Sequence, residues 1–277
     1  MAAGTDARDP APIGVFDSGV GGLTVLRALR ERLPEESLTY LGDTARLPYG
    51  TKSPRVVARY AENAARVLVE RGVKMLVIAC NTATAEALPH LERVFAPLPV
   101  VGVVEPGAEA ACEASRDGHI LVVATEGTVK SGAYARAIRA RRPSAVVRST
   151  ACSLFVALAE EGWVDGPIVE SVARRYLAPV VREDPSVDCM VLGCTHFPVL
   201  RDAIARVVGP GITLVDSAMT TARVVADRLR SRGMLAPRAN AAALELMATD
   251  ARARFARVGA VFLGAAISES QVEIVDL

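Results

Sequence analysis

Short runs of aliphatic residues alternate with longer amphipathic stretches along most of this chain. The runs are rich in Val, Ile and Leu and often lack polar residues at alternate positions, which is typical of strands buried on both faces of a sheet. We predict eight strands of this kind: residues 13–17, 38–43, 74–79, 100–105, 119–125, 145–150, 188–193 and 212–216.

Helical periodicity fills the segments between these strands, most clearly at residues 54–70. Apolar positions recur there at spacings of three and four residues: Val57, Tyr60, Ala64, Val67 and Leu68. Ser53 is the predicted N-cap, and Pro54 occupies the first helical position. Alternating strands and helices predict an α/β protein with parallel sheets, whose ligands bind at the carboxyl ends of the strands.

Two stretches of the chain resemble each other. VIACNTA surrounds Cys80 and VLGCTHF surrounds Cys194, 114 residues later, which is a domain-sized interval. A weaker pair is VFDSGVGGLTV (15–25) and VVATEGTVKSG (122–132), each a strand followed by a glycine-containing turn. We therefore predict two similar domains, each placing one cysteine at the end of a strand.

The second domain is predicted at residues 102–215, inserted into a first domain made of residues 12–101 and 216–277. The linkers would lie near residues 103–108 and 215–220. Residues 1–11 are polar, and we predict that they form a flexible N-terminus.

Composition narrows the functional classes. Of 277 residues, 51% are hydrophobic, and 32 Lys and Arg nearly balance 31 Asp and Glu. Without a concentrated basic face we expect no nucleic-acid partner. The cluster Arg136, Arg139, Arg141 and Arg142 is interpreted as a solvated helix face. With no apolar run near the length of a membrane span and no signal peptide, we expect a cytoplasmic protein without a membrane partner.

The five cysteines are odd in number and widely spread, which argues against a disulfide framework. Cys112, Cys152 and Cys189 are interpreted as packing residues, because free cysteine is commonly buried. Cys80 and Cys194 each follow the last residue of a strand, where we expect a helix to begin. The N–H groups of a helix N-terminus favour a thiolate, so packing and chemistry are both open for this pair.

A metal site is the other alternative for Cys194, because His196 is only two residues away. A structural zinc site needs four ligands, usually in short paired motifs, and the chain has none. His90 and His119 are isolated and are interpreted as surface or packed residues. We therefore predict no metal.

Polar residues gather after several predicted strands. Asp17 and Ser18 open the turn DSGVGG, which matches neither the dinucleotide fingerprint nor a P-loop. Further turns and hydroxyl donors follow at ARLPYG (45–50), CNTATA (80–85) and ATEGT (124–128). Such neutral donors suit a small, highly polar ligand that carries carboxylates.

In combination, IGVFDSGVGGLTVLRAL, YLGDTARLPYG, VIACNTATA, ATEGTVKSGAY and VLGCTHFPVL resemble the glutamate racemases of the cofactor-independent aspartate/glutamate racemase family. The resemblance runs from about residue 13 to the C-terminus. It implies two flavodoxin-like domains related by pseudo-twofold symmetry, with the active site in the cleft between them. It also implies glutamate as substrate, no cofactor, a homodimer, and a role in supplying D-glutamate for peptidoglycan.

The resemblance further implies a reaction by two thiols on opposite faces of the substrate. Cys194 would take the Cα proton of L-glutamate and Cys80 that of D-glutamate. Asp17 would assist Cys80, while His196 and Glu160, with Glu161 as the fallback, would assist Cys194. Together with the strand-end hydroxyls, the expected substrate-binding set is Asp17, Ser18, Pro48, Tyr49, Gly50, Asn81, Thr82, Thr125, Thr128, Thr195 and His196.

One segment departs from the family pattern. Around Cys152 the family usually has a Cys-Pro pattern and a further proline before the acidic pair, whereas this chain has Ser153 and Ala157. The nearest competing function is an aspartate racemase or a related decarboxylase, although His196 favours glutamate. A competitor from another class is a non-catalytic two-domain protein that closes on a small acid.

Overall fold

The computed structural model describes residues 9–237 and 242–277. Most of the predicted flexible segment 1–11 lies outside the described residues. Of the remainder, Asp9 is held against the body of the protein. Its N–H donates to the Leu235 carbonyl, and its own carbonyl accepts a hydrogen bond from Lys74.

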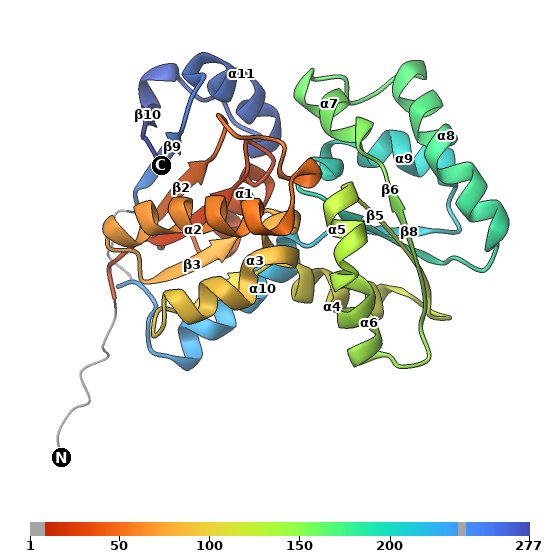
Figure 1. Ribbon diagram of the computed structural model, residues 1–277, viewed down its shortest axis with the longest axis horizontal. Helices are drawn as coiled ribbons and strands as arrows, with labels where there is room; N and C mark the ends of the chain where they lie inside the picture. The colour runs from red at the N-terminus through yellow and green to blue at the C-terminus, as the bar shows by residue number, and fades with distance from the viewer. Residues whose placement is uncertain (1–8, 238–241) are drawn as a thin grey trace.

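The chain forms two parallel sheets that lie in two lobes side by side (Figure 1). The first sheet has the order β10-β9-β2-β1-β3-β4. Its strands are β1 (Ile13–Asp17), β2 (Leu38–Gly42), β3 (Met75–Ile78), β4 (Val100–Gly102), β9 (Leu244–Ala248) and β10 (Val272–Ile274).

The second sheet has the order β6-β5-β7-β8. Its strands are β5 (His119–Ala124), β6 (Val146–Ala151), β7 (Cys189–Gly193) and β8 (Thr213–Val215). Counted from its own first strand, this order is 2-1-3-4, and β2-β1-β3-β4 of the first sheet has the same order. The two halves are therefore topological repeats of the flavodoxin type, and the first is extended by β9 and β10.

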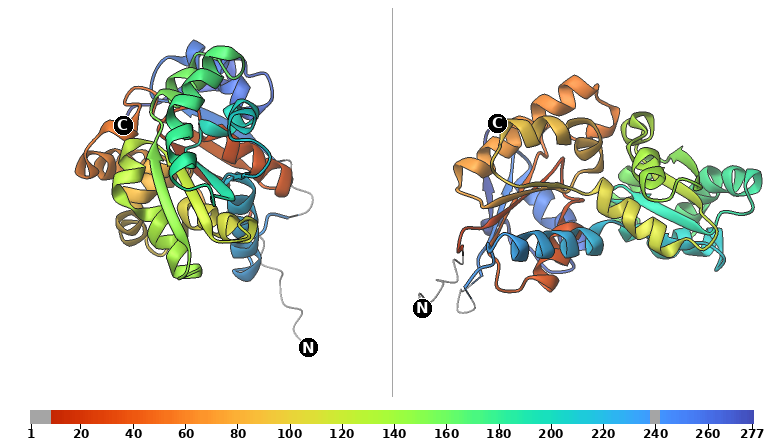
Figure 2. Two further views of the ribbon diagram at one scale, coloured as in Figure 1. Left: turned by 90° about the vertical axis from the view of Figure 1, so that its right-hand side faces the viewer. Right: turned by 90° about the horizontal axis from the view of Figure 1, so that it is seen from below.

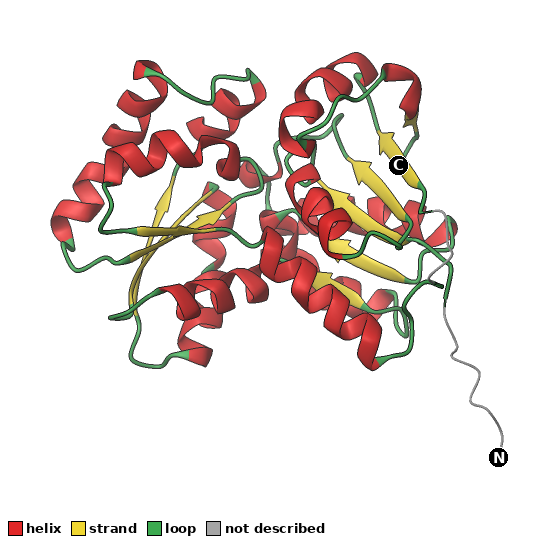
Figure 3. Ribbon diagram, turned by 180° about the vertical axis from the view of Figure 1, so that it is seen from behind, coloured by secondary structure: helices red, strands yellow, loops and turns green. Residues whose placement is uncertain are grey.

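Helices cover both faces of each sheet (Figure 3). In the first lobe they are α1 (Leu23–Arg32), α10 (Ala218–Ser231) and α11 (Arg252–Leu263) on one face, and α2 (Pro54–Glu70) and α3 (Asn81–Val94) on the other. In the second lobe they are α4 (Val104–Ala114), α5 (Glu126–Ser131) and α6 (Ala133–Arg141), opposite α7 (Leu154–Glu160), α8 (Pro167–Glu183) and α9 (Arg201–Val208). Three short 3₁₀ turns complete the elements: η1 (Tyr49–Thr51), η2 (Phe197–Leu200) and η3 (Glu269–Gln271).

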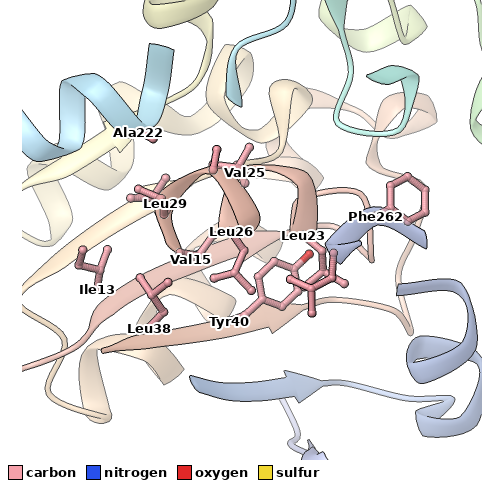
Figure 4. Packing of buried hydrophobic residues seen from close by; sticks show 14 of the residues in the cluster. Ile13, Val15, Leu23, Val25, Leu26, Leu29, Leu38, Tyr40, Ala222 and Phe262 are labelled. Carbon is pink, nitrogen blue, oxygen red and sulfur yellow. The ribbon is translucent and has the colours of Figure 1, made fainter. Parts of the chain in front are cut away.

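The core of the first lobe shows why its strands read as continuous apolar runs. Ile13 and Val15 of β1 are fully buried beneath Leu26 and Leu29 of α1, and Phe262 of α11 lies at the other end of the cluster, beyond Leu23 (Figure 4). Burial on both faces removes the polar alternation expected of a half-exposed strand. The edge strand β6 of the second sheet differs, because its residues are half-exposed or exposed.

All eight predicted strands are present, with ends shifted by up to three residues. The largest shift is at 100–105, where the strand stops at Gly102 and α4 begins at Val104. Pro106 does not prevent this, because the N–H groups of the first helical turn have no intrahelical partner. The segments 103–108 and 215–220, predicted as linkers, contain the starts of α4 and α10.

The predicted helix at 54–70 is confirmed as α2, with Pro54 in its first turn. Ser53 is the N-cap by position, but its side chain makes no capping hydrogen bond. β9 and β10 were not predicted. The β9 segment LELMA consists mainly of residues that favour helices, and β10 has only three residues.

The chain crosses between the lobes twice, from β4 into α4 and from β8 into α10. These two helices contact each other where the lobes join (Figure 2). We propose domain boundaries at residues 102 and 216, because they follow the last strand of each sheet before a crossing. Within the described residues, no helix is both long enough and apolar enough to cross a membrane.

Candidate active site between the two sheets

A small cavity lies where the carboxyl ends of strands from both sheets meet. Its volume is about 20 Å³, which is room for about one water molecule. Larger cavities elsewhere in the described chain do not contain either strand-end thiol. The residues that line the small cavity are Ser18, Pro48, Tyr49, Gly50, Cys80, Asn81, Thr82, Thr125, Val156, Cys194, Thr195 and His196.

Cys80 follows β3 and is the N-cap of α3. Its sulfur accepts a hydrogen bond from the Ala83 N–H (3.4 Å) and its thiol donates to the Ser18 hydroxyl (3.5 Å). Burial, followed by the nearby charge of Asp17, raises the pKa of Cys80 to about 12. Cys80 is therefore a neutral thiol at neutral pH, ready to donate a proton.

Asp17 ends β1 and is completely buried. Its carboxylate accepts hydrogen bonds from the Gly19 N–H (2.9 Å) and from the Thr195 hydroxyl of the other lobe (3.3 Å). Burial raises the pKa of Asp17, while the positive charge of His196 and these hydrogen bonds oppose the shift. Asp17 thus links the Cys80 side of the site to the Cys194 side.

The glycines of DSGVGG allow the two lobes to approach closely. A Cβ on Gly21 would lie 2.5 Å from the Thr195 hydroxyl oxygen and 2.6 Å from Nδ1 of His196. A Cβ on Gly22 would lie 2.5 Å from Cβ of Asp17. These distances are too short for any side chain, so the motif serves close packing around the site.

Cys194 directly follows β7, whereas Cys80 is the second residue after β3. The expected helix start is confirmed at Cys80 but wrong at Cys194. The Thr84 N–H bonds to the Cys80 carbonyl and continues α3, whereas the residue four after Cys194 is Pro198, which has no N–H. The chain therefore makes the 3₁₀ turn η2 before α9 begins.

His196 lies beside the Cys194 sulfur, with Nδ1 at 3.8 Å. Its Nε2 is 3.1 Å from Oε1 of Glu160, and Oε2 of that carboxylate accepts from Arg254 at 3.1 Å. Burial lowers the pKa of His196, but the bonds to Cys194 and Glu160 outweigh burial and raise it to about 10. His196 is therefore a cation at neutral pH, and it stabilises negative charge on the neighbouring sulfur.

Glu160 and Glu161 have different surroundings. Burial would raise the pKa of Glu160, but the hydrogen bonds and charges of His196 and Arg254 outweigh it and lower the pKa. The Glu161 side chain is 64% exposed, and its nearest charged partner is Arg254 at 3.8 Å. Glu160 is thus the member of the acidic pair that contacts His196.

Three threonine hydroxyls from both lobes form a cluster beside the thiols. Thr82 of α3 lies 2.9 Å from Thr125 and 3.1 Å from Thr128, and the last two are 3.1 Å apart. Thr128 contacts the cavity only through the other two. Hydroxyls both donate and accept, so the cluster can reorient its protons toward a bound anion.

Pro48, Tyr49 and Gly50 also line the cavity, and they form the N-cap and the first two residues of η1. The Tyr49 hydroxyl is already used, because it donates to Asp43 at 2.7 Å. A Cβ on Gly50 would lie 2.5 Å from Cβ of Thr125, so this glycine permits contact between the lobes. Asp43 was not named as a site residue, although its place after β2 was a signal.

The remaining cysteines and histidines lie away from the cavity. Cys152 and Cys189 are fully buried in the cores of the second lobe, and Cys112 is partly buried in α4, which confirms their interpretation as packing residues. His90 pairs with a glutamate and His119 with an aspartate, Glu62 and Asp184 respectively. No group of three or more potential ligand side chains that could hold a metal occurs in the described ranges.

Comparison with known proteins places this geometry in a family. The model of the Asp/Glu/Hydantoin racemase family matches residues 21–225, which is most of the chain. The chain belongs to this family.

Relatives within the family match over nearly their full length. A glutamate racemase of Geobacter metallireducens is 48% identical over 257 residues, covering 93% of this chain and 94% of the relative. A glutamate racemase structure from Bacillus anthracis has a TM-score of 0.90 at 36% identity, covering 96% of this chain and 98% of that one. One from Francisella tularensis, in complex with D-glutamate, has a TM-score of 0.89 at 35% identity, covering 97% and 98%.

The segment around Cys152, which departs from the family pattern, still delivers its acid to the site. Leu154–Glu160 forms the single helix α7. Phe155 of this helix packs edge-on against Phe197 of η2, with ring centroids 5.2 Å apart. This contact fixes the helix beside the turn that carries His196.

Proposed function

We propose that this protein interconverts L-glutamate and D-glutamate without a cofactor, by proton transfer at Cα between two thiols. The observation that carries the proposal is the placement of Cys80 and Cys194. They follow equivalent strands of two repeated sheets and line one cavity from opposite lobes. Two acid/base groups on opposite faces of a planar carbanion are what racemisation requires.

The reaction with L-glutamate begins with Cys194 as the thiolate and Cys80 as the thiol. Cys194 takes the Cα proton, so the Cα–H bond breaks and an S–H bond forms. Cys80 then gives its proton to the other face of the carbanion, which leaves Cys80 as the thiolate. That state is the one that accepts the proton of D-glutamate, so the reverse reaction uses the same two groups.

The charges around each sulfur support these starting states. The His196 cation lies beside Cys194, where it stabilises the thiolate, and Glu160 holds the imidazolium. Cys80 has its pKa raised to about 12, chiefly by burial. A glutamate Cα–H is a very weak acid, so oriented donors such as Asn81 and Thr195 must also stabilise the carbanion in a dry site.

The small volume of the cavity indicates that the two lobes are closed on each other and must separate to admit the substrate. The volume of about 20 Å³ is far too small for an amino acid with two carboxylates. Two chain crossings join the lobes, at β4 to α4 and β8 to α10, so a small rotation there would widen the cavity. Closure would then remove water from the reacting atoms.

Glutamate is the proposed substrate, because the near full-length relatives are named glutamate racemases. His196 at the position that marks glutamate in the resemblance agrees with this choice. We further infer a cytoplasmic homodimer that supplies D-glutamate for peptidoglycan, as the bacterial family implies. An aspartate racemase and a non-catalytic acid-binding protein remain the alternatives to test.

Circular dichroism of L-glutamate, and separately of L-aspartate, tests the proposal. Purified protein without added cofactor should abolish the optical activity of glutamate. In deuterated water, deuterium should appear at Cα of glutamate whichever enantiomer is supplied. Loss of signal with aspartate alone would overturn the substrate, and binding without turnover would favour the acid-binding alternative.

A further inference from the structure

Tyr134 connects the two lobes directly beneath the site. It lies in the first turn of α6 in the second lobe and is 2% exposed. Its hydroxyl donates a hydrogen bond to Oδ1 of Asn81 at 2.7 Å. Asn81 belongs to the first lobe, where it directly follows Cys80 and lines the cavity.

The tyrosine ring is held in place by two glycines. A Cβ on Gly107 would lie 2.8 Å from the Tyr134 hydroxyl oxygen, and a Cβ on Gly193 would lie 3.1 Å from its ring. Gly193 is the residue before Cys194. Tyr134 therefore contacts the residue next to each thiol, in a space that only glycine leaves open.

Only one of the two polar atoms of the Asn81 carboxamide forms a side-chain hydrogen bond to the described residues. Its oxygen is bonded to Tyr134, whereas its Nδ2 is buried and has no hydrogen-bond partner among the residues that the structure describes. An unpaired buried N–H is unfavourable and uncommon in folded proteins. In a residue that lines a cavity, such an N–H indicates a ligand acceptor.

The direction of the tyrosine hydrogen bond decides which ligand the amide can bind. A carboxylate only accepts hydrogen bonds, so it needs the N–H end of the carboxamide. With the amide reversed, the Asn81 oxygen would face a carboxylate and repel it. Burial raises the pKa of Tyr134 well above neutral, so its hydroxyl keeps the proton that it donates.

We propose that Tyr134 is a positioning residue, which fixes the Asn81 carboxamide so that its N–H group binds a carboxylate of the substrate. This proposal rests on the proposed function and deepens it. It gives the site a carboxylate-binding group on the Cys80 side, set by a residue of the opposite lobe. Closure of the lobes would then complete the binding group and the pair of thiols in one step.

A double-mutant cycle between Tyr134 and Asn81 tests the proposal. Tyr134→Phe keeps the ring packing and removes only the hydroxyl. We expect KM for glutamate to rise about tenfold, the effect of one buried hydrogen bond, with kcat changed less than about twofold. In an Asn81→Ala background the same substitution should change KM less than about twofold.

Two further variants separate positioning from a general loss of structure. Tyr176→Phe removes a hydroxyl that accepts from the Leu154 N–H in the same lobe, outside the cavity, and should leave KM unchanged. Asn81→Asp keeps an acceptor for Tyr134 but replaces the free N–H with oxygen. We expect it to raise KM more than tenfold, which tests the site even if Tyr134→Phe does not fold.

An equal effect of Tyr134→Phe in both backgrounds would overturn the proposal, as would an unchanged KM in Tyr134→Phe or in Asn81→Asp. The wild-type racemisation assay reports separately on the proposed function. If the wild type does not racemise glutamate, that function fails. The same cycle is then measured by calorimetry of D-glutamate binding, with Kd in place of KM.

Discussion

The Cys80 side and the Cys194 side of the site are built on the same strand order and surrounded by opposite charges. Cys80 caps the long helix α3 and has the Ser18 hydroxyl as its partner, with the buried Asp17 nearby. Cys194 has no helix at its position, and an imidazolium held by a carboxylate lies beside it. The fold repeats the position of the sulfur but not its environment.

The difference shows how a repeated fold can place two thiols in different electrostatic surroundings. A symmetric site would give both sulfurs one environment and no preferred donor. Here, burial and an anion raise the pKa of Cys80, while the imidazolium of His196 lies beside the sulfur of Cys194. The four predictions below test this contrast, from the largest expected effect to the smallest.

Replacing either sulfur should have the largest effect. Cys80→Ser and Cys194→Ser should each lower kcat by roughly 10²–10⁴-fold, because a hydroxyl is a far weaker acid than a thiol and does not ionise at neutral pH to accept the Cα proton. Racemisation followed by circular dichroism measures the loss. Cys112→Ser is the matched control. Cys112 is partly buried in α4 and does not line the cavity, so this variant should retain activity. Wild-type turnover in both of the first two variants would disprove the two-thiol reaction.

Removing one carboxylate should separate the two sides. Asp17→Asn and Glu160→Gln should each lower kcat on the order of 10²-fold. The two variants should differ in which enantiomer of glutamate is turned over more slowly. Since the enantiomers have equal free energy, kcat/KM stays equal in both directions and the asymmetry appears in kcat and KM. Asp17→Asn should slow D-glutamate turnover more, and Glu160→Gln that of L-glutamate.

The same pair of variants has a second measurable difference. The charge of Asp17 is one of the groups that raise the pKa of Cys80. In Asp17→Asn this pKa should therefore fall, as followed by the ultraviolet absorbance of the thiolate, whereas in Glu160→Gln it should change less. Identical effects of the two substitutions on both directions and on this pKa would contradict the contrast between the sides.

The loss of activity at alkaline pH should reflect deprotonation of His196. Its pKa is raised to about 10, so the imidazolium persists below that pH and is lost as the pH rises through it. We expect kcat for L-glutamate to fall about tenfold per pH unit above 10. His196→Asn should be slow at every pH and lack this limb. A wild-type profile that falls near pH 7 would contradict the assignment.

Arg254 should have the smallest effect, because its side chain is 45% exposed although it bonds to Glu160 across the two lobes. Exposed ion pairs contribute about 0.2–1 kcal/mol, so Arg254→Gln should reduce kcat/KM only about two- to fivefold. Arg252→Gln, an exposed arginine on the same helix, is the control. A hundredfold loss in Arg254→Gln alone would mean that Glu160 depends on this arginine.

The helix predicted after Cys80 was confirmed, whereas the one predicted directly after Cys194 was wrong. VIACNTA and VLGCTHF predict the same strand-to-helix turn, and the strands agree. Only Pro198, four residues beyond Cys194, distinguishes the second from the first, because it removes the N–H that would continue a helix. That signal was present in the sequence and could have been used.

The choice of Glu160 over Glu161 came from the family resemblance, because the helical periodicity of the chain does not distinguish them. Adjacent residues of a helix point about 100° apart, so one faces the site and the other faces solvent. Which one does so depends on how α7 packs against η2, through Phe155 and Phe197. Arg254 and Tyr134 were missed for the same reason, since each reaches the site from another element.

The sequence by itself determined eight of the ten described strands, the repeat and the positions of the two thiols, because apolar runs and turn residues are local properties of the chain. The tertiary structure decided which charge lies beside each thiol. Asp17 and Thr195 are 178 residues apart, and Glu160 and Arg254 are 94 apart, so their contacts exist only when the two lobes pack together. β9 likewise depends on tertiary pairing, with β2 on one side and β10 on the other, since the residues of its segment LELMA mainly favour helices.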